Sequence, residues 1–350
     1  MIGALELHGQ TLAELEALVA EWGYPSFRAK QLFAWLHRGA AFEAMHTLPA
    51  GLRERLQAQA TDRPAEVLET RRSALDGTIK LLYRLRDNHV VEGVLMRYRH
   101  GVTLCLSTQV GCAMGCAFCA STLDGKARDL TAAEMIGQVL CANTVLESGE
   151  AVHNVVLMGS GEPLENYGHT VNFLRLLREP DGLNIGLRHV SLSTCGLVPQ
   201  MTRLAEEGLP VTLSVSLHAP NDTIRQTIMP VARAYPMNDL IDACRYYVSK
   251  TGRRVVFEYA LMRGINEKPE HARELAGWLR GLQCHVNLIP LNIVEGRDFY
   301  AAGPQEIRAF QAQLEQLHIS VTQRREMGAD IQGACGQLRR AFISGKTKEG

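Results

Sequence analysis

The sequence lacks the features of a membrane or secreted protein. No apolar run among its 350 residues approaches the roughly 20 residues that a membrane-spanning helix needs. The stretch from Met1 to Glu6 has no basic segment followed by an apolar core, so it is not typical of a secretory signal. Aromatic residues are sparse at 6%, and the formal net charge is zero, so overall charge identifies no class of partner. These absences predict a cytoplasmic protein with no membrane partner.

The cysteine content argues against a framework of disulfides. Nine cysteines, an odd number, occur in a long chain without a secretion signal. Such thiols are expected to stay reduced and to serve packing, metal binding or catalysis. Six of the nine are scattered, and each of these is by default a small buried hydrophobe. The six are Cys105, Cys141, Cys195, Cys244, Cys284 and Cys335.

Two segments are more basic than the rest of the chain. Residues 71–100 hold seven Lys and Arg against three acids, and residues 321–350 hold six against three. Such clusters can neutralise the phosphates of a nucleic acid. They can also be the solvated face of a strand, and charge alone favours this second interpretation.

The first hundred residues divide into a helical part and a β-hairpin extension. Apolar spacing over residues 1–62 predicts three helices, over 11–21, 26–36 with Ser26 as N-cap, and 48–60. Asp76-Gly77 is typical of a two-residue hairpin turn. Strands over 81–85 and 90–96 continue it, so residues 63–100 are predicted to form the extension.

From residue 101 a strand, a loop and a helix alternate six times. Six βα units in one order imply parallel strands joined by right-handed crossovers. The predicted fold class is therefore α/β, a partial (β/α)6 barrel over residues 101–326 that binds ligands at the carboxyl ends of its strands. Residues 327–350 form a C-terminal loop and tail. The predicted strands are 103–107, 154–158, 189–194, 211–217, 254–261 and 285–291, and the helices are 131–147, 168–178, 199–207, 236–250, 268–281 and 304–317.

Three further cysteines follow the first barrel strand with C-x3-C-x2-C spacing: Cys112, Cys116 and Cys119. Three thiolates within eight residues can bind three irons of a 4Fe–4S cubane and leave the fourth iron open. S-adenosylmethionine (SAM) can chelate an open iron, so the spacing indicates a radical SAM enzyme. A zinc site is the alternative, but it needs a fourth ligand, and neither His89 nor His100 stands at knuckle spacing.

Polar residues at later strand ends are the candidate SAM site. The second strand ends in a glycine-rich turn with Gly161 and Glu162, where the carboxylate could accept from the ammonium group of SAM. The ends of the third, fourth and sixth strands add polar groups suited to ribose, carboxylate or adenine. These residues are Ser193, Ser216, Leu217, His218 and Asn292. Any single one could instead be a cap or a turn residue.

Two of the scattered cysteines gain interest from a family resemblance. Cys335 lies between small residues, where a thiol would be accessible, and Cys105 precedes the cluster motif by seven residues. Nearly the whole chain resembles the radical SAM RNA adenine-C2 methyltransferases that act on large-subunit rRNA. The matching segments are Phe27-Arg28-Ala29-Lys30-Gln31, Trp35-Leu36, Gln109-Val110-Gly111-Cys112, Ser216-Leu217-His218-Ala219-Pro220-Asn221-Asp222, Asn287-Leu288-Ile289-Pro290 and Ala334-Cys335-Gly336-Gln337-Leu338.

The resemblance implies a mechanism that uses two SAM molecules. One SAM methylates Cys335, and the radical made from the second abstracts a hydrogen from that methyl group. The resulting carbon radical adds to C2 of the adenine. Cys105 then attacks the sulfur of Cys335, which forms a disulfide and releases the methylated base. Glu92 matches the family's proton acceptor; without the resemblance it would pass as an exposed strand acid.

The resemblance also implies partners. These are rRNA, expected as protein-free 23S rRNA, tRNA adenine beside the anticodon as a further potential substrate, and an electron donor such as flavodoxin. The helical N-terminal domain and the hairpin extension would hold an unpaired adenine, since chemistry on a base edge needs the base out of its stack. We expect the protein to act as a monomer.

Some positions depart from the family pattern, and two rival functions stay open. Ser160 stands where Met is usual, Cys195 where Ser is commoner, and Gln332-Gly333 where Asp-Ala is usual. One rival is methylation of adenine C8, the activity of a sister group that confers ribosome-antibiotic resistance. The other is a non-catalytic Fe–S or zinc RNA-binding protein, which would need neither Cys105 nor Cys335.

Overall fold

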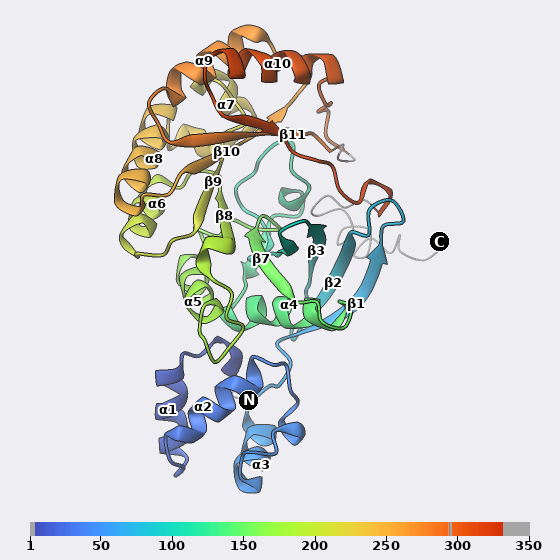
Figure 1. The fold of residues 1–350 in the computed structure, drawn as a ribbon, viewed down its shortest axis with the longest axis vertical. Helices are drawn as coiled ribbons and strands as arrows, with labels where there is room; N and C mark the ends of the chain where they lie inside the picture. Colours follow the sequence, from blue (N-terminus) through green and yellow to red (C-terminus); the bar gives the residue numbers. More distant parts are fainter. Residues whose placement is uncertain (1–3, 293, 295, 332–350) are drawn as a thin grey trace.

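One curved sheet of ten strands forms the centre of the molecule (Figure 1). The computed structural model describes residues 4–292, 294 and 296–331. The strand order is β1-β2-β3-β4-β7-β8-β9-β10-β11-β12. The bounds are β1 (Ala65–Arg72), β2 (Ile79–Leu85), β3 (Val90–Tyr98), β4 (Gly101–Cys105), β7 (Val152–Leu157), β8 (Val190–Thr194), β9 (Thr212–Ser216), β10 (Val255–Leu261), β11 (Cys284–Pro290) and β12 (Val321–Gln323).

The parallel part of this sheet confirms the predicted α/β barrel. Strands β4, β7, β8, β9, β10 and β11 pair in parallel in chain order, within two residues of the predicted bounds. The short strand β12, which the sequence analysis missed, pairs in parallel with β11. Only one of its three residues, Val321, is buried, so it carries no readable alternation.

Strands β1, β2 and β3 extend the same sheet in antiparallel fashion. The predicted two-residue turn at Asp76-Gly77 is wrong, because β1 and β2 are joined by residues 73–78. Within this loop the Ser73 hydroxyl accepts from the backbone N–H groups of Leu75 and Asp76, and the Asp76 carboxylate accepts from Thr78 N–H at 2.9 Å. These local side-chain bonds stabilise a longer turn than the dipeptide alone predicts.

Helices cover the outer side of the parallel strands (Figure 1). The predicted helices are confirmed as α4 (Ala132–Thr144), α5 (Tyr167–Leu177), α6 (Val198–Glu206), α8 (Met237–Thr251), α9 (Pro269–Leu279) and α10 (Pro304–Gln316). On β10, Phe257 and Tyr259 are fully buried on this side, and the Tyr259 ring lies 5.2 Å from that of Phe310 on α10. The alternate residue of β10, Glu258, faces the inner side, where the candidate site lies.

Three helices form the N-terminal part: α1 (Leu12–Glu21), α2 (Phe27–Leu36) and α3 (Ala50–Gln59). Thr11 is the N-cap of α1 and forms a capping box. Its hydroxyl accepts from the Glu14 N–H, and the Glu14 carboxylate accepts from the Thr11 N–H. The prediction that Ser26 caps α2 is wrong, because its backbone is already helical and its side chain makes no capping bond. None of the described helices combines the length and apolar character needed to cross a membrane.

The short 3-10 helix η1 (Leu7–Gly9) joins this N-terminal part to the barrel. It packs against α4, and a Cβ added at Gly9 would lie 2.8 Å from the backbone nitrogen of Ala133. His8 of η1 is fully buried and His37, just after α2, is nearly so. Burial lowers the pKa of His8 to about 3, with a contribution from nearby His37, and burial lowers the pKa of His37 to about 4. Both imidazoles are therefore neutral in the folded protein.

This histidine pair predicts a loss of stability in mild acid. The unfolded chain binds protons on both histidines below about pH 6.5, and the folded chain does not, so the free energy of unfolding falls as pH drops. Between pH 7.5 and pH 5.5 we expect these two groups to lower it by about 2–3 kcal/mol. Urea unfolding at the two pH values should show this difference, and a His8→Leu/His37→Leu variant should lose most of it. An equal pH dependence in that variant would contradict the assignment.

Candidate active site

The three-cysteine motif lies in a loop that follows β4 and is anchored at both ends. Its first part contains strand β5 (Gln109–Gly111), which pairs antiparallel with β6 (Lys126–Asp129). Gly111 has a φ of +79°, and a Cβ there would lie 1.9 Å from the carbonyl oxygen of Gly125. Only glycine fits this close crossing. The Ala117 N–H donates to the Ile228 carbonyl at the end of α7 (Asp222–Ile228), a helix that the sequence analysis missed.

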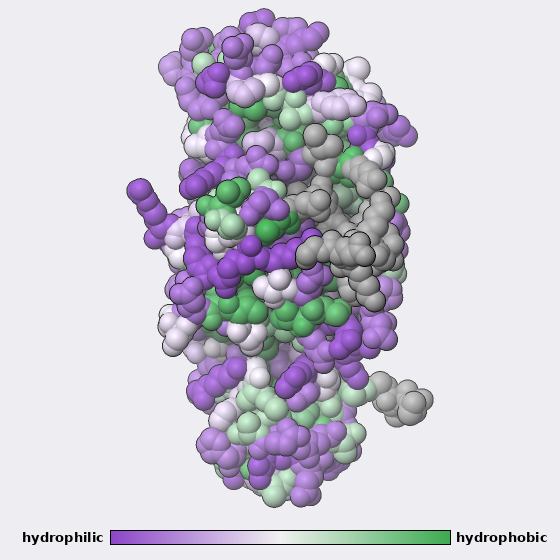
Figure 2. All heavy atoms as spheres, turned by 90° about the vertical axis from the view of Figure 1, so that its right-hand side faces the viewer, coloured by the Kyte–Doolittle hydropathy of each residue, from purple (hydrophilic) through white to green (hydrophobic). Residues whose placement is uncertain are grey.

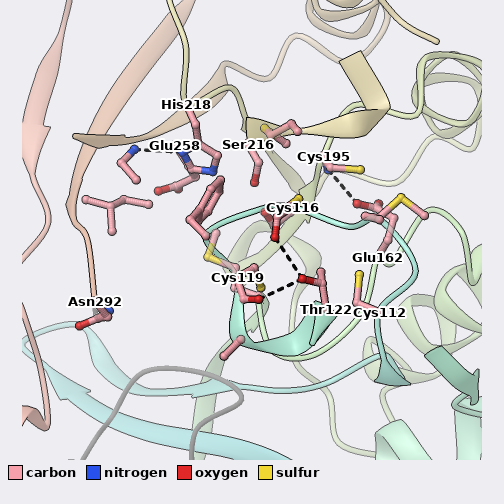
Figure 3. A pocket seen from close by; sticks show the side chains of 18 of the residues that line it. Cys112, Cys116, Cys119, Thr122, Glu162, Cys195, Ser216, His218, Glu258 and Asn292 are labelled. Carbon is pink, nitrogen blue, oxygen red and sulfur yellow. Dashed lines mark hydrogen bonds between the residues drawn. The ribbon is translucent and has the colours of Figure 1, made fainter. Parts of the chain in front are cut away.

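Cys112, Cys116 and Cys119 all line one cavity at the carboxyl ends of the strands (Figure 3). The Thr122 hydroxyl lies 3.0 Å from the carbonyl oxygens of both Cys116 and Cys119, which ties the second half of the loop to itself. Burial raises the pKa of Cys112 to about 12 and raises that of Cys116 as well. Without a metal these thiols are neutral, and only a strong cation would make them thiolates.

The donor set fits a cubane. Each of the three thiols would bind a different iron of a 4Fe–4S cluster, and the cavity beside them has a volume of about 290 Å³. Across the part of the chain that the structure describes, no three His, Cys, Asp or Glu side chains converge on a point suited to a single metal ion. Three thiols on one shared cavity are the donors that a multi-iron group requires.

Gly161 and Glu162 line the same cavity. Glu162 is almost fully buried, and its two carboxylate oxygens accept backbone N–H groups from Cys195 at 2.7 Å and Leu164 at 3.0 Å. Burial raises its pKa, although these two bonds oppose the shift. Gly161 has a φ of +110°, and a Cβ there would lie 2.6 Å from the Gln109 side chain. Glycine is thus required at this position by packing on the cysteine loop.

The other predicted strand-end residues divide into those on the cavity and one that is elsewhere. Ser193, Ser216, His218 and Asn292 line it, whereas Leu217 belongs to the buried apolar core. Leu217 faces away because it follows Ser216 directly and successive residues of a strand point to opposite sides. The Nδ1 atom of His218 accepts the Ala260 N–H at 2.9 Å, and burial lowers the pKa of His218 to about 3, so this imidazole is neutral.

Several cavity residues were missed by the sequence analysis. Arg324 follows β12 and Thr122 ends the short 3-10 helix η3 (Ala120–Thr122), segments without a recognisable pattern, and Cys195 had been noted only as a departure. Glu258 did leave a signal, because it is the only charged residue within the otherwise apolar or aromatic β10. A lone acid in the middle of a fully buried strand rarely occurs without a partner or a role.

Cys105 lies next to this cavity on β4, and Glu92 lies on the neighbouring strand β3. Cys105 is buried and packs with Val94, Met158 and Met327, and Met158 also lines the cavity. Glu92 is buried as well, rather than exposed, and its carboxylate forms an ion pair with buried Lys80 at 3.2 Å. Neither side chain is among those that line the cavity. Cys335, with Gln332 and Gly333, lies outside the described residues.

The described segment before Cys335, residues 324–331, runs across the open side of the barrel from β12 to the β1–β2 turn (Figure 1). Arg324 donates to the Met158 sulfur at 3.8 Å. Farther along, the Gly328 N–H donates to Asp76 at 2.8 Å, and Asp330 accepts from the Ser73 hydroxyl at 2.6 Å. The hydrogen bond from Ser73 lowers the pKa of Asp330. We call residues 324–331 the strap.

Nothing in the structure explains the choice of side chain at the two remaining departures from the family pattern, Ser160 and Cys195. Ser160 is buried, and its N–H donates to the Ser107 hydroxyl at 3.0 Å while its carbonyl accepts from Gln109 N–H. Burial raises the pKa of Cys195 well above its ordinary value, so this thiol is neutral. Both residues hold the backbone around the cysteine loop through main-chain atoms.

A three-cysteine loop after the first strand of a partial α/β barrel, opening into a polar-rimmed cavity, defines a radical SAM protein. Residues 106–276 match the Radical SAM superfamily, and residues 5–61 match the ribosomal RNA large subunit methyltransferase N-terminal domain. The chain is similar over 95% of its length to the crystal structure of a radical SAM methyltransferase from Sphaerobacter thermophilus, with a TM-score of 0.91, 46% sequence identity and 98% of that chain covered.

The particular family follows from full-length relatives. The chain is 50% identical over 340 residues to the probable dual-specificity RNA methyltransferase RlmN of Alkaliphilus oremlandii, covering 97% of this chain and 98% of the relative. It is 47% identical over 350 residues to the protein of the same name from Clostridium tetani, covering 100% and 99%. The chain belongs to the RlmN family of radical SAM methyltransferases, which confirms the resemblance and implies a 4Fe–4S cluster and SAM as its cofactors.

Proposed function

We propose that this protein methylates C2 of adenine in RNA, with 23S rRNA as the main substrate and tRNA as the second. The names of its full-length relatives support this activity. The observation that carries it is the placement of two elements outside the cluster motif. Cys105 packs against the cavity residue Met158, and the strap leads the chain past the same place toward Cys335. A methyl-carrying cysteine and a resolving cysteine would have to meet, and Met327 of the strap, eight positions before Cys335, packs with Cys105.

Cys112, Cys116 and Cys119 would hold the cluster, which when bound supplies the electron that cleaves SAM. Gly161 and Glu162 would bind the methionyl part of SAM, and Ser193, Ser216, His218 and Asn292 the remainder. These roles are supported by the common position of these side chains on the cavity. Leu217 would contribute through its backbone, which donates to the Glu258 carbonyl at 3.1 Å.

Cys335 would carry the methyl group, and Cys105 would attack its sulfur to release the methylated base. Glu92 would accept the proton that leaves C2 of the adenine. The backbone of Glu92 is tied to the turn that follows β7. The Glu92 carbonyl accepts from the Ser107 hydroxyl, and that hydroxyl accepts from the Ser160 N–H. Lys80 balances the charge of Glu92 in a site from which water is excluded.

The RNA would be held by the N-terminal helices and the β1–β3 extension. The basic excess of residues 71–100 contributes less to phosphate binding than its count predicts. Four of its seven cations form ion pairs within the protein: Arg71, Lys80, Arg84 and Arg97. Figure 2, which shows the side of the molecule on the right in Figure 1, has apolar side chains near its middle between hydrophilic surfaces. Exposed Phe27, with Arg28 over its ring at 4.7 Å, is a further candidate for base stacking.

The remaining partners follow from the same activity. We propose a monomer that takes its electrons from a small donor such as flavodoxin and acts in the cytoplasm, on rRNA before ribosomal proteins bury the target. The adenine must leave its stack to reach the cavity, so an unpaired RNA segment is the substrate that fits.

The methyl-carrier role of Cys335 gives the direct test of the proposed function. Mass spectrometry of the Cys335 peptide from protein purified from cells should show one added methyl group. A Cys335→Ala variant should still bind iron but yield no methylated RNA, because no other residue would carry the methyl group. Analysis of the modified nucleoside should give 2-methyladenosine. Wild-type amounts of product from the variant, or 8-methyladenosine from the wild type, would contradict the proposal.

A further inference from the structure

A buried carboxylate in the cavity has one oxygen without a partner. Glu258 is 3% exposed and lines the same cavity as the three cysteines (Figure 3). Its Oε1 accepts from the Asn287 side-chain amide at 3.1 Å. Its Oε2 is buried and has no hydrogen-bond partner among the described residues. A buried charged oxygen left in this state costs free energy, so the site is built to receive a donor.

Neighbouring strands hold Glu258 in place from one side. The oxygen of the Asn287 amide accepts from the Thr322 hydroxyl at 3.1 Å, which orients the amide nitrogen toward Glu258. The Thr322 hydroxyl also lies 2.9 Å from His285 Nε2. This series of hydrogen bonds links β10, β11 and β12. It holds Oε1 of Glu258 in place and opposes rotation of the carboxylate. The remaining oxygen is therefore an acceptor preorganised by the fold.

The position of Glu258 within the cavity indicates which part of a ligand it meets. Strand register places Glu258 beside Ser216 of β9. In Figure 3 it lies with Ser216 and His218, away from Glu162 and Cys112. The amino and carboxylate groups of SAM would have to reach the cluster held by the cysteines, so the nucleoside part would lie on the side of Ser216 and Glu258. The donors of that part are the ribose hydroxyls and the adenine amino group, and carboxylates accept from ribose hydroxyls in other nucleotide sites.

We propose that Glu258 Oε2 accepts a hydrogen bond from a ribose hydroxyl of an adenosine bound in this cavity. Two adenosines enter the site, that of SAM and the target nucleotide of the RNA, and their ribose chemistry is the same. Burial raises the pKa of Glu258, while the positive charge of Arg324 and the bond from Asn287 oppose the rise. A hydroxyl donor would add to this opposition and favour the ionised carboxylate.

The test measures binding to the holoenzyme with its cluster oxidised, so that SAM is not consumed. The probes are SAM and its 2′-deoxyribose and 3′-deoxyribose analogues, applied to the wild type, Glu258→Gln and Glu258→Ala. The Gln variant keeps the shape of the side chain and guards against a folding failure. Ser214→Ala is the matched control, because Ser214 is one pleat from Ser216 on β9 but does not line the cavity. Iron content verifies that each protein holds its cluster, and circular dichroism verifies that each is folded.

We expect Glu258→Ala to weaken SAM binding by about ten- to a hundredfold, the effect of losing a hydrogen bond to a charged group. One deoxy analogue should bind the wild type more weakly by a similar factor, and the variant should bind that analogue and SAM equally. Ser214→Ala should bind like the wild type. Because SAM binding needs no RNA, this result stands or falls independently of the proposed RNA methylation.

A second arm identifies the source of the ribose. If SAM binding is unchanged but the KM for RNA rises about ten- to a hundredfold, and a 2′-deoxy target adenosine removes that difference, the hydroxyl belongs to the target nucleotide. Two results overturn the proposal. One is wild-type binding of both SAM and RNA by the Glu258 variants. The other is additivity: the loss of binding free energy for the variant with the deoxy analogue equals the sum of the two separate losses. If the carboxylate and the hydroxyl form one hydrogen bond, removing the second partner should cost nothing further.

Discussion

The Cys105→Ala variant is expected to remain covalently joined to its RNA. In the proposed route the base becomes bonded to Cys335 through the transferred carbon, and Cys105 breaks that bond by forming a disulfide with the Cys335 sulfur. Without the Cys105 thiol, nothing attacks the Cys335 sulfur, so the covalent protein–RNA adduct cannot be resolved. Denaturing electrophoresis should show a protein–RNA band, and mass spectrometry should find the nucleotide on the Cys335 peptide. Methylated RNA released at the wild-type rate would contradict the role of Cys105.

The geometry supports this outcome in two ways. Cys105 and Met327 of the strap belong to the same small apolar cluster. Cys335 follows Met327 by eight positions, and such a length of chain can span up to about 28 Å, so connectivity allows the two thiols to meet. Cys284→Ala is a matched control, since Cys284 is a partly exposed thiol at the start of β11 and does not line the cavity. It should release its product and form no adduct.

The parts of the fold that the sequence predicted are those with long, regular patterns. Strand β10 is apolar or aromatic except for Glu258, strands β8 and β9 alternate apolar residues with Ser or Thr, and α4 and α10 show helical spacing over 13 residues each. What was missed is short or local. Strand β12 has three residues and α7 has seven, too few for either period to be recognised. The 73–78 turn depends on side-chain bonds of Ser73 and Asp76, which a dipeptide rule does not include.

The site shows the same division between local pattern and three-dimensional arrangement. The three cysteines form a local motif, so their common cavity could be predicted from spacing alone. The Leu217 side chain lies in the apolar core, opposite Ser216, as the two-residue period of a strand predicts. The burial of Glu92 could not be predicted, because it depends on Lys80 in the neighbouring strand. Nor could Arg324, which reaches Met158 across the open side of the barrel.

The Cys116→Ala variant is expected to lose the cluster and the activity while keeping the fold. Cys116 is one of the three predicted iron ligands, and its loop is held by main-chain bonds to Thr122 and Cys119 that the substitution leaves intact. Iron content should fall to background, and RNA methylation should fall by more than about a hundredfold, the upper end for losing even an outer-shell partner of a metal site.

The matched control for this loss is Cys195→Ala, which separates a metal ligand from a thiol that merely lines the cavity. Cys195 lines the same cavity and is buried, and it holds Glu162 through its backbone N–H at 2.7 Å as well as through its thiol. The alanine variant keeps the backbone bond, so it should retain full iron content and lose only the packing and the weak hydrogen bond of the thiol, about 1–2 kcal/mol. Equal iron loss in both variants would mean that the cavity rather than the motif determines binding. Iron retained in Cys116→Ala would remove Cys116 from the ligand set.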